Sequence, residues 1–174
     1  MSVLKLVNFQ YCPRCGAQRL EANGSKAFIC TACGFIYHHS PAPAAAGIIQ
    51  VNGQIILTKR GREPQKGLLT IPGGFLEYEE SFEAALQREL MEELNLAVTA
   101  PVYLCSYWGK YLYADVVYCT TIAYFIIEMR DISNARASDD VENFVLARPD
   151  EIDLDKLAFD GDRFALNRYV ERSQ

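Results

Sequence analysis

The sequence predicts an α/β fold in which a mixed sheet packs between helices, preceded by a small zinc ribbon. Segments rich in Val, Ile, Tyr and Thr alternate with two helical segments in the order strands, helix, strands, helix. Two Cys-x-x-Cys pairs precede all of them. We therefore place a zinc ribbon in residues 1–40 and an α/β domain in residues 41–174.

Length and composition fit one domain with a small appendage. The chain has 174 residues, half of them hydrophobic, which is ample for one core of average size. No apolar run reaches transmembrane length and the N-terminus lacks a signal-peptide pattern, so we expect a cytoplasmic protein without a membrane partner. Residues 1–39 carry four cations against one anion, a net charge of +3, which leaves −8 for the remainder of a chain at −5. A mildly basic ribbon is weak evidence for binding of nucleic acid, and the negative net charge of the whole chain argues against such a partner.

The ribbon prediction depends on four cysteines with zinc-ligand spacing. They form two pairs with fourteen residues between them: Cys12, Cys15, Cys30 and Cys33. Each pair is typical of a knuckle that holds Zn²⁺ tetrahedrally through thiolates, and a glycine after each second cysteine suits the turn. Two disulfides are the alternative, but they need an oxidising compartment and nothing suggests export. His38 and His39 follow closely and could be spare ligands, although four thiolates already fill the site.

The first strands of the domain follow a short stiff linker, Ser40 to Pro43. Ala44 to Val51 and Ile55 to Lys59 are predicted strands joined through Asn52-Gly53, a strong hairpin signal. Leu68 to Ile71 is predicted as a short strand before a proline.

Three more strands and a helix complete the domain. The predicted strands are Val98 to Trp108, Asp115 to Glu128 and Val141 to Leu146. Cys105 and Cys119 lie in these apolar segments, so we expect both to be core residues. The chain ends in a predicted helix from Asp162 to Arg172, with an apolar side made by Phe164, Leu166, Tyr169 and Val170.

The segment from Ser81 to Leu94 predicts a helix that carries acids on its apolar side. Ala and Leu predominate there and no Pro or Gly interrupts. The apolar stripe is marked by Phe82, Leu86 and Leu90. Glu89 and Glu93 fall on the same stripe, and Glu92 lies at its edge. Burial of an unpaired carboxylate is costly and three together repel, but a divalent cation such as Mg²⁺ or Mn²⁺ resolves both costs.

A solvated acidic face is the alternative, because most Glu-rich helices are of that kind. Two observations favour the metal site here. The acids share the stripe with Phe82 and Leu86, and a glycine-rich turn at Gly73-Gly74 leads into the helix.

The spacing of these residues resembles the Nudix box of Nudix hydrolases. The matching positions are Gly74, Glu80, Arg88-Glu89-Leu90, Glu92-Glu93 and Asn95-Leu96, separated by five, seven, one and one residues. The family usually has glycine where Asn95 stands. A helix C-cap with positive φ is needed there, and Asn is the usual second choice. The resemblance covers residues 43–172 and implies an α/β/α sandwich.

The resemblance also implies metal-dependent hydrolysis of a diphosphate linked to another group. It makes Glu89, Glu92 and Glu93 the catalytic ligands of Mg²⁺ or Mn²⁺, with one of them a candidate base for the attacking water. Glu80 and Arg88 are structural in the family, where the arginine pairs with the loop glutamate. Cations also reconcile an acidic helix with an anionic substrate, because they neutralise charge and lower the pKa of bound water.

Two downstream features are further candidates. Many Nudix hydrolases carry an acid before a late strand that completes the metal site, and Asp140 aligns best with it; a solvated loop acid is the alternative. Trp108 and Tyr111 belong to an aromatic cluster, with Tyr107 and Tyr113, whose rings could stack on a base of the substrate. The same rings could instead lie in the core or on the surface of a homodimer.

A zinc ribbon ahead of the box resembles NADH pyrophosphatases and ADP-ribose pyrophosphatases. The former carry a Ser-Gln-Pro-Trp-Pro-Phe-like signature after the box, whereas the nearest stretch here, Ser106 to Tyr111, lacks the prolines. We expect a pyrophosphohydrolase of a nucleoside diphosphate linked to another moiety, of the NAD(H), ADP-ribose or FAD class. The alternative is a catalytically silent module that senses a nucleotide or binds nucleic acid or protein. All box carboxylates are present, which favours the enzyme.

Overall fold

The computed structural model describes residues 10–24 and 26–172, and the chain divides into two compact units after Pro41. The first unit is an antiparallel sheet of three strands: Leu20–Ala22 (β1), Ala27–Cys30 (β2) and Ile36–His38 (β3). Among its described residues, the buried apolar side chains are Cys12, Ala27, Phe28 and Cys30. Two of these are predicted zinc ligands, so little apolar surface is left to stabilise this sheet by burial alone.

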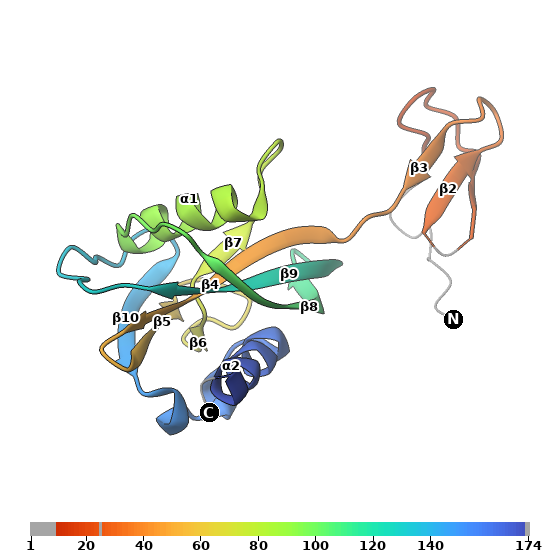
Figure 1. The fold of residues 1–174 in the computed structure, drawn as a ribbon. Helices are drawn as coiled ribbons and strands as arrows, with labels where there is room; N and C mark the ends of the chain where they lie inside the picture. Colours follow the sequence, from red (N-terminus) through yellow and green to blue (C-terminus); the bar gives the residue numbers. More distant parts are fainter. Residues whose placement is uncertain (1–9, 25, 173–174) are drawn as a thin grey trace. The chain divides into compact units, whose positions relative to one another are not determined.

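The second unit has a seven-stranded mixed sheet between two helices (Figure 1). Five strands follow the order β10-β5-β4-β9-β8, with β6 beside β5 and β7 beside β4. β4 and β9 are parallel, and the other five pairs are antiparallel. The predicted mixed sheet between helices is therefore confirmed.

The elements of this unit have the following bounds. The strands are Ala42–Val51 (β4), Gln54–Arg60 (β5), Leu69–Thr70 (β6), Gly73–Phe75 (β7), Val102–Tyr113 (β8), Val116–Glu128 (β9) and Val141–Ala147 (β10). The helices are Phe82–Leu94 (α1) and Asp160–Arg172 (α2), with short 3-10 helices at Pro149–Glu151 and Leu154–Lys156. No helix among the described residues is long and apolar enough to cross a membrane.

Each helix packs a separate hydrophobic core against one face of the sheet. Leu86 and Leu90 of α1 belong to one core with Ile49. Leu166 of α2 belongs to the other core with Ile48. Consecutive residues of β4 thus face opposite cores, as the alternation of side chains along a strand requires. This central strand is buried on both faces.

The predicted hairpin at Asn52-Gly53 is present, with φ of 50° and 76° at the two residues. A type I′ turn needs positive φ at both central positions. A second turn of this kind joins β8 to β9 at Ala114 and Asp115, with φ of 47° and 63°. The sequence did not predict it, because alanine is not a usual choice for a positive φ, although aspartate is.

The predicted bounds of β8 were wrong at both ends. The strand begins at Val102, because Ala100 adopts φ of 49° and Pro101 follows. It continues past Trp108 to Tyr113, because its antiparallel pairing with β9 carries it through Gly109, which pairs with Thr120.

The linker is shorter than predicted, since Ala42 and Pro43 already pair with Thr120 and Thr121 of β9. Proline is tolerated at the beginning of a strand. The predicted turn at Gly73-Gly74 is part of β7, antiparallel to β4. Its glycines carry little strand signal, so tertiary pairing decides its conformation.

Candidate active site

Capping residues fix both ends of the acidic helix. The side chain of Ser81 accepts a hydrogen bond of 3.2 Å from the Ala84 N–H at the start of α1. Asn95 ends the helix with φ of 55° and ψ of 38°, and its N–H donates to the carbonyl oxygens of Leu90 and Met91. Asn95 thus forms the left-handed C-cap that was predicted for this position, where the family usually has glycine.

Two glycines bring the segment before α1, which is β7 and the loop that follows it, into close contact with β4 and α1. Gly73 has φ of 143°, and a Cβ there would lie 2.2 Å from the carbonyl oxygen of Ala45. A Cβ on Gly74 would lie 2.3 Å from both Cδ and Oε1 of Glu89. The carboxylate of Glu89 therefore packs against bare backbone, and any side chain at position 74 would displace it.

Arg88 ties the same loop to the helix. Its guanidinium donates from Nε to Glu80 Oε1 at 2.8 Å and from Nη2 to Glu80 Oε2 at 3.0 Å, a bidentate ion pair. Nη2 also donates to the carbonyl oxygen of Phe75 at 3.0 Å. The hydrogen bonds from Arg88, with one from the N–H of Glu77, hold the pKa of Glu80 down at about 2.

Glu93 is the most deeply buried acid of the helix, with 9% of its surface exposed. Burial raises its pKa to about 8, although the N–H of Gly73 donates to its Oε2 at 3.1 Å. The nearby carboxylates of Glu89, Asp140 and Asp139 raise this pKa further. An ionised Glu93 therefore lacks compensating positive charge, which is the environment that a bound cation would stabilise.

Arg88 also contacts the other two box glutamates. Its Nη1 donates to Glu89 at 2.9 Å and to Glu92 at 3.1 Å. Burial raises the pKa of Glu89 in spite of Arg88. Glu92 is more accessible, with 49% of its side chain exposed.

The carboxylate oxygens of these acids are neighbours without forming one compact ligand set. Within the described part of the chain, the cysteine cluster is the only group of three or more ligand atoms that all lie within 4.8 Å of one another.

Asp139 and Asp140 reach this site because their loop is bonded to the end of α1. The N–H of Ser138 donates to the carbonyl oxygen of Glu93 at 3.0 Å, and the N–H of Arg136 donates to that of Leu94 at 2.9 Å. The last carbonyl groups of a helix have no partner within the helix, so this loop satisfies them. The predicted acid Asp140 is thereby placed next to the box, where its side chain pairs with Arg62.

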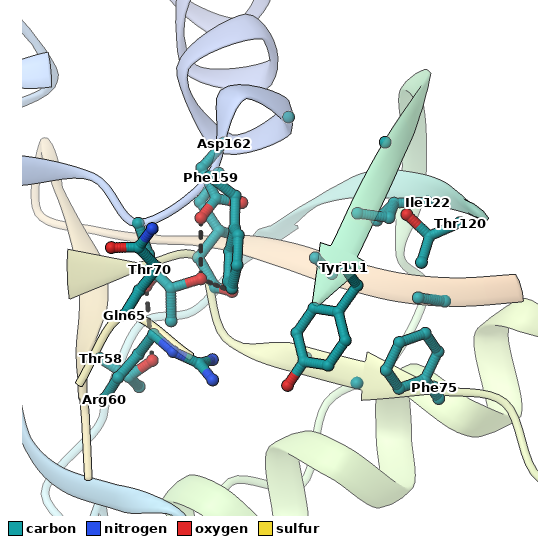
Figure 2. Close-up of a pocket in the computed structure, with 18 of the residues that line it drawn as sticks. Thr58, Arg60, Gln65, Thr70, Phe75, Tyr111, Thr120, Ile122, Phe159 and Asp162 are labelled. Atoms are coloured by element: carbon teal, nitrogen blue, oxygen red, sulfur yellow. Dashed lines mark hydrogen bonds between the residues drawn. The ribbon is translucent and has the colours of Figure 1, made fainter. Parts of the chain in front are cut away.

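A cavity of about 860 Å³ lies over these acids and extends to a group of aromatic rings. The ring centroid of Tyr111 is 5.4 Å from that of Phe75 and 6.0 Å from that of Phe159. The guanidinium of Arg60 lies 5.0 Å above Phe159 (Figure 2). Trp108 also borders the cavity, but 67% of its surface is exposed, so it is not the core residue considered above.

A buried carboxylate that the sequence did not reveal lies beside these rings. Asp162 is 3% exposed and accepts a hydrogen bond from Thr70 Oγ1 at 2.7 Å (Figure 2). It also accepts one from the Tyr124 hydroxyl at 3.0 Å. Burial raises its pKa to about 6. The network joins the first turn of α2 to the sheet. The sequence did not reveal it, because an acid is equally common in the first turn of a helix whose acid is exposed to solvent.

The four predicted zinc cysteines come together in the first unit. The Sγ atoms of Cys12 and Cys33 are 3.8 Å apart, and those of Cys15 and Cys30 are 3.7 Å apart. A tetrahedral site with Zn–S bonds of about 2.3 Å has edges of roughly 3.8 Å, so the residues present fit zinc.

Comparisons with known proteins agree with this geometry. The sequence profile of the NUDIX domain matches residues 40–167. The ADP-ribose pyrophosphatase of Methanocaldococcus jannaschii is 46% identical over 61 residues, which are 35% of this chain and 36% of that protein. The NAD-capped RNA hydrolase NudC of Haemophilus influenzae is 30% identical over 95 residues, which are 53% of this chain and 36% of that protein. The matches thus cover about a third of each of these two relatives.

A solved structure shows the same fold. The crystal structure of a Nudix hydrolase from Nitrosomonas europaea aligns with a TM-score of 0.73 at 24% identity, over 94% of this chain and 91% of that one. The profile match spans most of the chain and includes the box, the acids beside it and the surrounding sheet. The chain therefore belongs to the Nudix hydrolase family.

Proposed function

We propose that this protein is a metal-dependent pyrophosphohydrolase of a nucleoside diphosphate linked to another moiety, of the NAD(H), ADP-ribose or FAD class. The observation that carries the proposal is a single cavity lined both by the half-buried Glu89 and the buried Glu93 and by the rings of Tyr111 and Phe159. The names of the two relatives, an ADP-ribose pyrophosphatase and a NAD-capped RNA hydrolase, support this substrate class.

Mg²⁺ or Mn²⁺ would be held by Glu89, Glu92 and Glu93, with Asp140 completing the set. These are hard oxygen donors, and two of them have pKa values raised by burial, so the donors suit a divalent cation. Such a cation supplies charge neutralisation on the diphosphate and a lowered pKa for the attacking water. One of these three glutamates is the candidate base for this water.

The remaining residues of the site orient the substrate and the acids. Arg88 and Glu80 hold the glycine loop against α1, which fixes the position of Glu89. Tyr111, Phe75 and Phe159 offer ring faces and edges to a nucleobase. In the first unit, the four cysteines would hold Zn²⁺ in a closed thiolate site with a structural role.

A substrate panel tests the proposal. Purified protein with Mg²⁺ or Mn²⁺ should cleave ADP-ribose, NADH or FAD with a higher kcat/KM than any deoxynucleoside triphosphate. Release of AMP scores the conjugates, and release of pyrophosphate or phosphate scores the triphosphates. The Glu93→Gln protein, prepared in parallel, controls for contaminating hydrolases. A panel in which the triphosphates rank first would overturn the substrate class.

The stacking role assigned to Tyr111 and Trp108 has its own test. Tyr111→Ala should raise KM for the best substrate by a factor of several, because a base–aromatic stack contributes about 1–3 kcal/mol. Trp108→Ala is the matched comparison, and we expect a smaller rise because this ring is mostly exposed. Equal KM values for both variants and the parent would exclude stacking on these rings.

A further inference from the structure

An ion pair formed by two residues outside the Nudix box includes the proposed metal ligand Asp140. Arg62, on the loop between β5 and β6, pairs with Asp140 on the loop before β10. The backbones also meet, since the Gly61 N–H donates to the Asp140 carbonyl oxygen at 2.8 Å. A Cβ on Gly61 would lie 2.8 Å from the same oxygen. Close backbone contact therefore keeps Arg62 next to Asp140.

Arg88 and Arg62, which both pair with acids of the site, differ in how firmly they are held. Arg88 makes five hydrogen bonds, and 22% of its side chain is exposed. The side chain of Arg62 is 63% exposed and has Asp140 as its one ion-pair partner in the described part of the chain. An exposed pair of this kind contributes little free energy. Arg62 can therefore leave its partner easily, whereas Arg88 cannot.

Arg62 and a cation need the same carboxylate. Asp140 lines the same cavity as the box glutamates Glu89, Glu92 and Glu93, so its carboxylate faces the space in which a cation would be held. A carboxylate oxygen held by a guanidinium is a poorer ligand for that cation. Arg62 also lines the cavity, and its planar fork matches the paired oxygens of a phosphate group.

We propose that Arg62 is a positioning residue that exchanges partners. It releases Asp140 to the cation when cation and substrate enter the cavity, and it then pairs with the diphosphate of the substrate. This inference rests on the proposed function, because it takes Asp140 as a metal ligand and a diphosphate as the substrate. It predicts opposite effects of the same substitution on cation binding and on substrate binding.

The cation test uses Mn²⁺ alone, followed by electron paramagnetic resonance of the free ion on protein treated with a mild chelator. Arg62→Ala should tighten Mn²⁺ binding by about two- to five-fold, the range of an exposed ion pair. Lys66→Ala is the matched control, because it removes an exposed cation from the same loop. It should leave the Mn²⁺ affinity unchanged. In an Asp140→Asn background, which itself should bind Mn²⁺ more weakly, Arg62→Ala should have no effect.

The substrate test is steady-state kinetics at saturating Mn²⁺ with the best substrate of the panel. Arg62→Ala should raise KM several-fold with a smaller change in kcat, and Arg62→Lys should recover only part of the loss, since lysine lacks the fork. A KM equal to that of the parent protein overturns the exchange.

Other outcomes also decide against the proposal. Weaker or unchanged Mn²⁺ binding in Arg62→Ala would mean that the ion pair merely holds the loop. Equal tightening in the Asp140→Asn background would reveal a general charge effect. The Mn²⁺-binding experiment needs no turnover. Its failure can therefore be distinguished from failure of the proposed function, which the substrate panel tests.

Discussion

Glu93 combines burial with a single backbone donor, the N–H of Gly73. A substitution to glutamine keeps its shape and removes its charge. Glu93→Gln should therefore leave the fold intact and lower kcat by at least about 10²-fold, the scale of losing a key electrostatic contributor. Steady-state kinetics at saturating Mg²⁺ measure this, with Glu83→Gln, an exposed acid of the same helix, as the control. A folded Glu93→Gln protein with near-normal kcat would refute the site assignment.

The raised pKa of Glu93 has a consequence for stability. Its pKa is about 8 in the folded chain and ordinarily 4.5, so between these values the folded state holds a proton that the unfolded state has lost. The free energy of unfolding of chelator-treated protein should then decrease as the pH rises from about 4.5 to about 8, by a few kcal/mol in order of magnitude. Thermal unfolding across this range measures the slope.

The Glu93→Gln protein is the control for this slope and should show a shallower one. Cation binding requires the ionised carboxylate, so the Mn²⁺ affinity of the parent protein should increase over the same pH interval. Identical pH dependence of the melting temperature in both proteins would show that Glu93 titrates normally.

At the level of single residues, helical periodicity predicted Glu89 and Glu93 because their position on an apolar stripe is a local pattern. Arg62 and Asp162 carry no such pattern. Each acquires its role from a partner far along the chain, Asp140 for the first and Thr70 for the second. Contacts of this range depend on strand order and loop geometry, which the sequence does not display.

At the scale of elements, α1 owes its bounds to its caps. Asn95 occupies the left-handed region, and its side chain donates to the carbonyl oxygen of Asn134 at 3.0 Å. Asn95→Ala should lower the free energy of unfolding by about 1 kcal/mol, because a Cβ without a polar group is disfavoured there. Asn95→Gly should stay within about 0.5 kcal/mol of the parent, since glycine adopts this conformation freely but loses the side-chain bond.

Urea unfolding of the two Asn95 variants measures the difference. If alanine were tolerated as well as glycine, the backbone at this position would not limit the helix.

The same backbone preferences explain where the prediction of element bounds failed. β8 begins late because Ala100 has a positive φ, and it runs on through Gly109 because β9 pairs with it. Tertiary pairing overrides local propensity in strands more readily than in helices.

At the scale of the whole molecule, the two units have different sources of stability. The second unit has two hydrophobic cores, one on each face of its sheet. The described residues of the first unit bury few apolar side chains, two of which are cysteines. A bound metal would therefore replace a hydrophobic core in the first unit, as in other small metal-dependent folds.

Purified protein should accordingly contain one zinc ion per chain. Thiol-modifying reagents should release it, whereas mild EDTA should remove only the cation held by carboxylates, since a closed thiolate site exchanges slowly. Metal analysis by mass spectrometry measures both. The zinc site would be disproved by zinc-free protein, or by unchanged zinc content in Cys12→Ser and Cys30→Ser variants.

The contact between Gly74 and Glu89 leaves no room for a side chain at position 74 while Glu89 keeps its position. A methyl group at position 74 overlaps the carboxylate group itself, so a side chain there would displace the carboxylate of Glu89. A lineage that abandons catalysis would be released at both positions together. Among descendants of this sequence, a larger residue at 74 should accompany a shorter one at 89, and this coupled change would mark chains that have lost the proposed hydrolysis.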